Sequence, residues 1–540
     1  MSRNTRSVVA VFLFTAWLTS AAVAQWQVGV GGVPARHGQS AEVGPHSPTT
    51  LWSGPSGTTV SQQHVVDQGI VVTNRMFNIG DPINGTDIEA RDLLTGALLW
   101  DVQVPASFGD SWRSRVTGFR DGQVYVTRSG NTNAEYLYAL DPADGSIIWT
   151  SVDLMTETST ESVCFAPNGD IITSGVATAG ARLIRIDKDD GTTVWTTPGT
   201  CPTSGGCDPV VFGNRVYMFE ASASGPKITA VDLATGAKLY SGPGIVGGFI
   251  QQVAPFVGPD GTVYAPRTQN NPLTDFLVAY DDTGAALVEK WRTPLGFCAF
   301  ASFGVGPDGS VYSYSANKEV LRLDPANGNV TGTSPPIPAD SFHPRVAIGA
   351  DGTLYLTNGA FGNGALFAYT PDLDLLWSVP LTNVNVGGPA LADGGILVVG
   401  GTSNTVNTYR CAAYFDAYGA GCAGSGGFTP SLSGLGCPAP GETVTLELDG
   451  ALGGTTGFLF FGAGTGIQPV LGCDLQILPL LPLNFGLPLG GVGAGNGGFS
   501  LPGLIPPTTP PVDLYLQVMV PDPGSAGGAA GSNPLQMHIE

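Results

Sequence analysis

Charged residues are scarce in this sequence: they make up 12% of its 540 residues, and only five of them are lysines. The formal charge at pH 7 is 22 − 43 = −21, and no cluster of Lys and Arg interrupts the acidic balance. Such a surface repels phosphate backbones and anionic lipid headgroups, so we expect no nucleic-acid partner. The acidic composition fits an exported protein but identifies no ligand.

A long apolar run is also missing. The apolar stretch Val8–Leu18 is too short to cross a bilayer as a helix, and no later segment is long enough. Arg3 and Arg6 precede this stretch and small residues follow at positions 22 and 24, which is the three-part pattern of a secretory signal peptide. We therefore expect residues 1–24 to be removed. The mature protein would be soluble, without a transmembrane segment, in the periplasm or outside the cell.

Paired cysteines of the Cys-x-x-Cys type are absent, and the five histidines are scattered, so no metal site is predicted. The eight cysteines permit disulfides in an oxidising compartment. Cys201 and Cys207 bracket a turn-rich loop that could close on itself. Cys422, Cys437 and Cys473 could brace the end of the chain, but the sequence does not determine the pairing.

Glycine and proline are abundant, with 78 Gly and 42 Pro, or 120 of 540 residues. Both residues disfavour long helices, because glycine raises the entropic cost of ordering and proline lacks an N–H donor. Glycine shows no three-residue period, which excludes collagen. The composition predicts an all-β protein of short strands joined by tight turns.

A repeat with a period of 43 to 49 residues organises the chain between about residues 60 and 420. One half of each unit places Asp-Gly before a strand ending in Tyr, which is a strong hairpin signal. This half begins at Asp121, Asp260, Asp308 and Asp351. The other half spaces Asp, Gly and an aromatic residue four apart. It reads Asp92…Gly96…Trp100, Asp141…Gly145…Trp149, Asp187…Gly191…Trp195 and Asp232…Gly236…Tyr240.

Four strands per unit at this period are typical of a β-propeller. The count of half-units predicts eight blades, with seven as the alternative. The last blade would borrow its outer strand from Thr50-Leu51-Trp52, which would close the ring. We expect an N-terminal segment at 25–49, the propeller at 50–418 and a linker at 419–428.

The units Ala90–Gly96 and Ala230–Gly236 resemble the pyrroloquinoline-quinone (PQQ) type of propeller repeat, Ala-x-Asp-x-x-Thr-Gly-x-x-x-Trp. The resemblance implies the fold of the quinoprotein alcohol dehydrogenase-like superfamily. It does not imply one chemistry, because the same repeat builds dehydrogenases and a lipoprotein of outer-membrane assembly. The repeated Asp, Gly and Trp residues are expected to be structural, since turns and blade packing account for all three.

Residues 429–540 have a different character, with alternating strands and Gly/Pro-rich connections such as Glu442–Leu448. They predict a small antiparallel β-sandwich. This region resembles a C-terminal module of secreted bacterial proteins, which implies a role in display, sorting or binding.

These resemblances leave two alternative functions, one enzymatic and one in binding. A PQQ- and calcium-dependent dehydrogenase would hold its cofactor in the propeller centre, under a ring formed by adjacent cysteines. The sequence has no adjacent cysteines, so we expect no catalytic residues and no cofactor. A polysaccharide-binding surface protein, acting through residues 425–540, is the other alternative. Binding or scaffolding without catalysis is the favoured interpretation.

The mouth of the propeller channel is the candidate site, because concave surfaces with converging polar groups are typical binding sites. Arginines there could bind a carboxylate at two points. The partner would be an envelope or extracellular protein, or a small polar ligand. Alternatively, these groups could simply satisfy one another around a wet channel. The candidate residues are Trp112, Arg113, Arg115, Glu161, Asp208, Gln252, His343 and Arg345.

Overall fold

The computed structural model describes residues 26–29, 31–54, 64–76, 86–105, 113–129, 134–156, 163–175, 183–200, 208–244, 248–249, 254–297, 304–337, 344–359, 362–382, 384, 387–400, 406–525 and 527–540. Strands account for nearly all the regular structure in these segments, beside the short 3₁₀ turns η2 (Asp393–Gly395) and η3 (Ser425–Gly427). The predicted all-β propeller fold is confirmed. None of the helices in these segments is long and apolar enough to cross a membrane.

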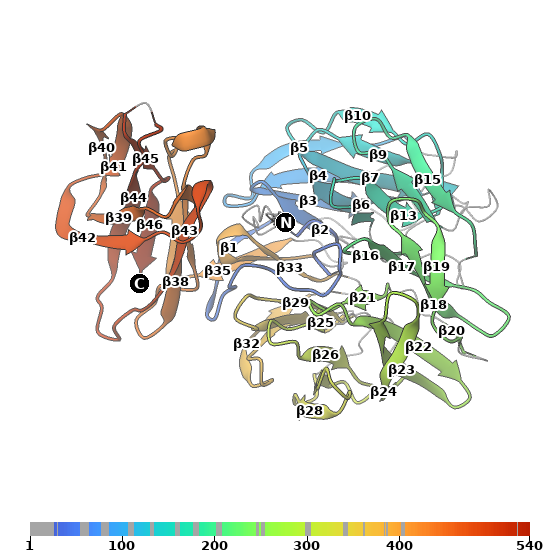
Figure 1. The fold of residues 1–540 in the computed structure, drawn as a ribbon. Helices are drawn as coiled ribbons and strands as arrows, with labels where there is room; N and C mark the ends of the chain where they lie inside the picture. The colour runs from blue at the N-terminus through green and yellow to red at the C-terminus, as the bar shows by residue number, and fades with distance from the viewer. Residues whose placement is uncertain are drawn as a thin grey trace, which may run out of the picture.

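In the described segments, eight antiparallel sheets of at least four strands lie around a common axis (Figure 1). In each sheet the strands run from the channel outward. The innermost strands are β2 (His64–Asp67), β6 (Arg113–Arg120), β12 (Cys164–Phe165), β16 (Val210–Phe212), β21 (Phe256–Val257) beside β20 (Gly248–Phe249), β25 (Gly304–Val305), β29 (Arg345–Ile348) and β33 (Pro389–Ala392). The second strands are β3 (Ile70–Met76), β7 (Gln123–Ser129), β13 (Ile171–Ser174), β17 (Arg215–Glu220), β22 (Val263–Asn270), β26 (Val311–Tyr314), β30 (Leu354–Thr357) and β34 (Ile396–Val399).

The two outer strands complete each sheet. The third strands are β4 (Thr86–Asp92), β9 (Leu137–Leu140), β14 (Leu183–Ile186), β18 (Lys227–Asp232), β23 (Leu273–Asp282), β27 (Val320–Leu323), β31 (Gly364–Tyr369) and β35 (Asn407–Cys411). The outermost strands are β5 (Leu98–Val102), β10 (Ile147–Thr150), β15 (Thr193–Thr197), β19 (Lys238–Ser241), β24 (Leu287–Gly296), β28 (Val330–Thr333), β32 (Leu375–Leu381) and β1 (Pro48–Ser53). β8 (Ala134–Glu135) and β11 (Met155–Thr156) form a separate small ribbon.

The last sheet takes its outermost strand from the beginning of the chain, as the sequence predicted. β1 pairs antiparallel with β35, and Thr50 lies opposite Tyr409. Strands β33 and β2, the innermost strands of the last and first sheets, contact each other. The two ends of the repeat region are therefore joined by backbone hydrogen bonds, which removes exposed sheet edges at the junction.

The repeated Asp, Gly and Trp residues form one joint between neighbouring sheets. In one unit, Asp141 Oδ1 accepts the N–H of Ala143 at 2.8 Å and holds the turn. Gly145 has a φ of 73°, and a Cβ there would lie 2.8 Å from the ring of Trp100 in the preceding sheet. Trp100 Nε1 also donates to the carbonyl of Pro142 at 2.7 Å. The three positions are thus structural, with Asp shaping the turn, Gly admitting the ring and Trp linking the sheets.

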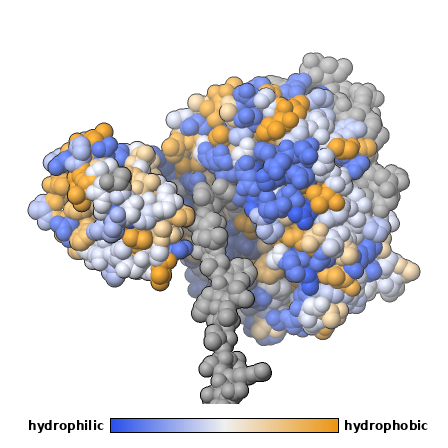
Figure 2. Space-filling model, turned by 45° about the horizontal axis from the view of Figure 1, so that its top comes forward, coloured by the Kyte–Doolittle hydropathy of each residue, from blue (hydrophilic) through white to orange (hydrophobic). Residues whose placement is uncertain are grey.

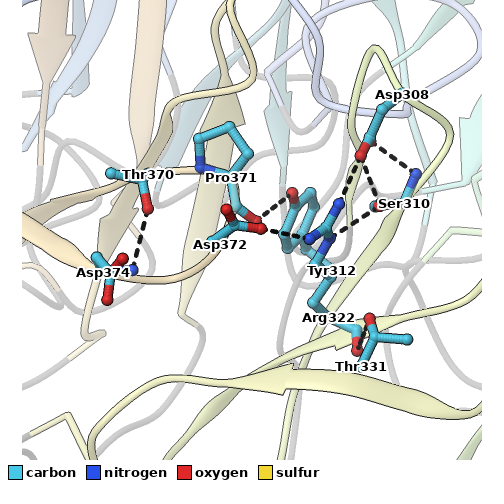
Figure 3. Close-up of polar contacts among 9 residues, drawn as sticks. All are labelled: Asp308, Ser310, Tyr312, Arg322, Thr331, Thr370, Pro371, Asp372 and Asp374. Carbon is cyan, nitrogen blue, oxygen red and sulfur yellow. Dashed lines mark hydrogen bonds and ion pairs between the residues drawn. The ribbon is translucent and has the colours of Figure 1, made fainter.

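The hairpin formed by the Asp-Gly half of the repeat also links neighbouring sheets. Asp308 accepts the N–H and the hydroxyl of Ser310, at 2.9 and 2.8 Å. Arg322 bridges Asp308 and Asp372 of the next sheet at 2.7 and 2.6 Å (Figure 3). The hydroxyl of Tyr312 donates to the carbonyl of Pro371 at 2.9 Å. One side-chain cluster therefore fixes the hairpin and joins two sheets.

The N-terminal segment lies against the hairpin-side ends of the innermost strands and follows them around the ring. Backbone bonds join it to the first and second sheets through Trp26 and Gln27, and to the later sheets through residues 34–42. Trp26, Val28 and Arg36 are almost fully buried. The segment therefore packs against the innermost strands on the hairpin side, a position that the sequence analysis did not predict.

The C-terminal region forms a second unit beside the junction of β1 and β35 (Figure 1), and Figure 2 shows it next to the largely hydrophilic propeller face. Two sheets share a core that includes Leu448, Leu459, Leu516 and Val518. One sheet contains β36 (Tyr414–Ala417), β46 (Leu535–Ile539), β44 (Val512–Pro521), β39 (Thr456–Gly462), β42 (Leu480–Pro488) and β45 (Ala529–Gly531). The other contains β37 (Ser431–Leu435), β38 (Thr443–Gly453) and β43 (Gly493–Leu504), and β40 (Thr465–Val470) pairs with β41 (Cys473–Ile477).

One boundary differs from the prediction. β36 falls within residues 50–418 but pairs with β46, so the second unit takes its first strand from the end of the predicted propeller segment. The physical reason is that Phe415 packs into the core of the second unit.

Two disulfides involve this region. Cys422–Cys473 braces the second unit, and Cys411–Cys437 ties β35 of the propeller to the connection after β37. Cys164 is a buried thiol, and Cys201 and Cys207 lie outside the described residues.

Candidate functional site

Three of the predicted mouth residues lie in the described part of the chain with their side chains. Arg115 is in β6, Arg345 begins β29, and Asp208 precedes β16 by two residues. Their exposed fractions are 3%, 4% and 0%, so all three are buried within the ring rather than spread on an open rim. The backbone of Arg113 begins β6. Trp112, Glu161, Gln252 and His343 lie outside the described residues.

Arg115 and Arg345 occupy equivalent positions in different sheets. Arg115 lies opposite Thr127 on β7, and Arg345 lies opposite Thr357 on β30. Thr357 donates its hydroxyl proton to the carbonyl of Gly387 in the next sheet, at 2.9 Å. The structure therefore places two guanidinium groups at the same level of the channel, in the second and seventh sheets.

Several buried polar atoms at this level have no hydrogen-bond partner in the described part of the chain. They are Nδ1 of His64, both side-chain polar atoms of Asn74, and the hydroxyls of Thr127 and Thr173. These residues belong to the first three sheets, on the half of each strand that is remote from the Asp-Gly hairpins. A buried polar group without a partner costs about 1–3 kcal/mol, so a bound polar molecule would relieve it.

The electrostatics at this end favour neutral histidine. Burial lowers the pKa of His64 to about 4, although its hydrogen bond to the carbonyl of Val398 acts in the opposite direction. The ring is therefore uncharged at neutral pH, and its Nε2 lies 3.0 Å from that carbonyl oxygen, so Nε2 carries the proton. Nδ1 is left as an acceptor.

Arg36 of the N-terminal segment reaches the innermost strands beside Asp208, since its partner Pro209 is the next residue. Arg36 Nε donates to the carbonyl of Pro209 at 2.9 Å, and the thiol of Cys164 contacts the same carbonyl at 3.1 Å. Burial raises the pKa of Cys164, and the charge of Arg36 partly opposes this rise. The thiol is therefore protonated at neutral pH and is not activated as a nucleophile.

A second concave site was missed by the sequence analysis. A cleft of about 850 Å³ lies between the propeller and the C-terminal unit. It is lined by acidic residues from three remote segments, including Glu42, Asp393 and Glu447. Nothing in their spacing along the chain indicates that they meet, since their proximity depends on how the second unit docks.

Comparison with known proteins gives one family match. A family model described as outer membrane protein assembly factor BamB matches residues 84–334. No curated protein matches the chain.

The chain is also similar to solved structures at low sequence identity. BamB from Moraxella catarrhalis is 13% identical, with a TM-score of 0.42 over 67% of this chain and 99% of that chain. A quinohemoprotein alcohol dehydrogenase from Pseudomonas putida is 13% identical, with a TM-score of 0.39 over 72% and 80%. The Dos1 propeller is 10% identical, with a TM-score of 0.49 over 67% and 95%. The family match over residues 84–334 and the repeated Asp–Gly–Trp joints of the sheets are consistent with a PQQ-like β-propeller.

Proposed function

We propose that this chain is an exported, non-catalytic binding or scaffolding protein that receives its partner at the mouth of the channel, opposite the Asp-Gly hairpins. The partner is an envelope or extracellular protein, or a small polar ligand. The observation that carries the proposal is the group of buried, unsatisfied polar atoms of His64, Asn74, Thr127 and Thr173. The N-terminal segment lies along the hairpin-side end of the innermost strands, so we place the partner at the opposite end.

The residues present do not fit the cofactor of the quinoprotein dehydrogenases. The resemblance would require adjacent cysteines over the quinone, and the sequence contains none. Among the residues that the structure describes, no three His, Cys, Asp or Glu side chains are arranged to hold a metal ion. These features support binding over PQQ- and calcium-dependent oxidation.

The test uses the mature full-length protein, immobilised and incubated with the exported fraction of its source cells. Thr127→Val should reduce retention of the partner at least about tenfold, because the lost hydroxyl removes a hydrogen bond worth about 1.4 kcal/mol. Thr117→Val is the matched control. Thr117 is also fully buried, but its hydroxyl already donates to the carbonyl of Tyr125 at 3.0 Å. Equal retention by both variants would contradict the proposed site.

The dehydrogenase alternative has its own measurement. Added PQQ and calcium should leave the melting temperature and the quinone absorbance unchanged. Quinone-dependent oxidation of alcohols with an artificial electron acceptor would overturn the non-catalytic assignment.

A further inference from the structure

The cleft between the propeller and the C-terminal unit has the size of a small-molecule site, at about 850 Å³. One wall comes from the N-terminal segment and from hairpins of the first and last sheets. The other wall comes from β36, β37 and β38 of the C-terminal unit. The charged side chains in the lining are Glu42, Asp92, Asp393, Arg410, Asp416, Glu447 and Asp449.

The lining charges are not balanced, since six carboxyl groups face one guanidinium group. The guanidinium carbon of Arg410 lies 3.8 Å from the ring centroid of Tyr414 and forms no ion pair within the described segments. Asp92 is occupied by its own turn, where Oδ1 accepts the N–H of Thr95 at 2.8 Å. The remaining carboxyl groups leave a net negative potential in a concave site, and the low-dielectric walls strengthen it.

Three of these acids influence one another although they are remote in the sequence. Burial and the nearby charges of Asp393 and Glu447 raise the pKa of Glu42 to about 8, against hydrogen bonds from the backbone at Gly394 and Gly395. The Gly395 bond to Glu42 Oε2 is 3.1 Å long. Burial raises the pKa of Asp393 to about 6. A cation placed among them would favour the ionised forms.

A buried acid beside the cleft points the same way. Asp67 is 2% exposed, and its Oδ1 has no hydrogen-bond partner in the part of the chain that the structure describes. The next three residues, 68–70, line the cleft. Burial, with a contribution from the charge of Asp393, raises the pKa of Asp67 to about 7. Asp67 is not itself part of the cleft lining, so it acts on the cleft through its charge interaction with Asp393.

The distribution of the carboxyl groups selects the kind of cation. No three His, Cys, Asp or Glu side chains of the described segments are grouped so that they could hold a metal ion. The acids lie on both walls of the cleft, with Glu42 and Asp393 on one and Glu447 on the other, which suits ammonium groups separated by methylene chains. Apolar lining from Ile70, Leu93 and Leu432 would contact the methylene groups.

The two walls are held in place by cross-links. The Cys411–Cys437 disulfide joins the propeller to the C-terminal unit. His46 of the N-terminal segment bridges Asp351 at 2.7 Å and Glu442 of the C-terminal unit at 3.7 Å. A cleft with fixed walls loses little conformational entropy on binding, which favours affinity for a flexible ligand.

We propose that the cleft between the propeller and the C-terminal unit binds linear organic cations of the polyamine type, through the carboxylates of Glu42, Asp393 and Glu447. This site is separate from the channel mouth, so it does not depend on the proposed function. Ammonium groups could come from a free polyamine or from lysine side chains of a peptide, and the chemistry is the same.

The test is titration calorimetry of the full mature chain with spermidine, and in a second arm with a hexalysine peptide. Glu42→Gln/Glu447→Gln should weaken spermidine binding by about tenfold or more, because it removes two of the three carboxyl groups that would pair with the ammonium groups. The double variant should fold, because it removes two acids that repel each other. Asp474→Asn is the matched control, because Asp474 is an exposed acid of the same unit outside the cleft lining.

Proton linkage gives a second readout. Spermidine binding should strengthen between pH 6 and 8.5 and release protons, measured in buffers of different ionisation enthalpy. This pH dependence should weaken in Glu42→Gln, and what remains should come from Asp67 and Asp393. Binding of spermidine alone would support the site and indicate a free polyamine as the ligand. Binding of both probes would support the site for either source of ammonium groups. Binding of hexalysine alone would assign the ammonium groups to a peptide. Equal binding by the double variant and wild type, no binding of either probe, or tighter stoichiometric binding of calcium would overturn the proposal.

Discussion

Trp52 Nε1 donates a hydrogen bond of 2.8 Å to the carbonyl oxygen of Leu93, across the junction between the last and first sheets. The ring of Trp52 also fills the space above Gly96, where a Cβ would lie 2.5 Å from the indole. The same joint recurs within the ring between Trp100 and Gly145. The chain therefore closes the propeller with the contact that it uses between consecutive sheets.

Replacing Trp52 should weaken the closure. Trp52→Ala should lower the free energy of unfolding by about 2–3 kcal/mol, because it removes a large packed side chain and a hydrogen bond. Trp52→Phe should cost about 1 kcal/mol, since most of the packing remains. Urea unfolding followed by tryptophan fluorescence measures both. A loss in Trp52→Ala no larger than in Trp52→Phe would show that ring packing contributes nothing at this junction.

The N-terminal segment offers a test with a matched pair of glycines. Gly32 and Gly69 have φ values of 67° and 72°. A Cβ at Gly32 would lie 2.7 Å from the ring of Trp26, whereas a Cβ at Gly69 would meet nothing within 4 Å. Gly69→Ala should cost about 1 kcal/mol from backbone strain alone, and Gly32→Ala should cost about 1–3 kcal/mol more. Equal losses of stability, measured by urea unfolding, would mean that the ring of Trp26 does not pack tightly against Gly32.

The sequence predicts the structure of the repeat better than it predicts which residues meet at the sites. Asp141, Gly145 and Trp149 are predictable because each joint depends on a turn and on the next unit, both encoded within one period. Arg36 could not be assigned to the innermost strands, because its position depends on how the segment before the repeat follows them. Trp26 and Val28 alternate as in a strand, but that signal is too short to be decisive.

The mouth residues illustrate the same division. Arg115 and Arg345, which were chosen by counting back from the hairpins, lie opposite Thr127 and Thr357 in two sheets. Their deep burial is a property of the assembled ring. Glu42 and Glu447 meet only because the C-terminal unit docks beside the first and last sheets, and local periodicity carries no information about docking.

Stability should fall as pH rises from about 4.5 to about 8. The folded pKa of Glu42 is raised from 4.5 to about 8, that of Asp67 to about 7 and that of Asp393 to about 6. In this window the folded state binds more protons than the unfolded state, so the free energy of unfolding decreases with pH. Glu42→Gln should be more stable than wild type at pH 8 and should show a shallower slope. Urea unfolding at pH 5, 6, 7 and 8 measures this. A steeper slope in the variant would contradict the assignment.

Titration of His46 should also lower the stability of the protein as pH rises, but through the loss of a positive charge. Its hydrogen bond to Asp351, assisted by Glu442, raises its pKa above 6.5. The contribution to stability is fully present below pH 6.5 and is lost as pH rises through the folded pKa. His46→Ala should cost about 1 kcal/mol or less at pH 5.5, because the pair is partly exposed, and almost nothing at pH 9. A pH-independent loss would indicate packing rather than charge.

Removing the two disulfides one at a time should show which of them fixes the docking of the C-terminal unit on the propeller and which only stabilises that unit. Cys411 and Cys437 are 26 residues apart and tie the propeller to the C-terminal unit, whereas Cys422 and Cys473 are 51 residues apart and brace the C-terminal unit. Loop-closure entropy gives stabilisations of about 3.5 and about 4 kcal/mol, so the two double Cys→Ser variants should lose similar amounts of stability. Their binding should differ, because only Cys411→Ser/Cys437→Ser releases one wall of the acidic cleft. That variant should bind spermidine at least about tenfold more weakly, a loss of about 1.4 kcal/mol, at a temperature where calorimetry shows both units folded. Undiminished binding would mean that His46 and the packing of the two units hold the cleft without the covalent tie.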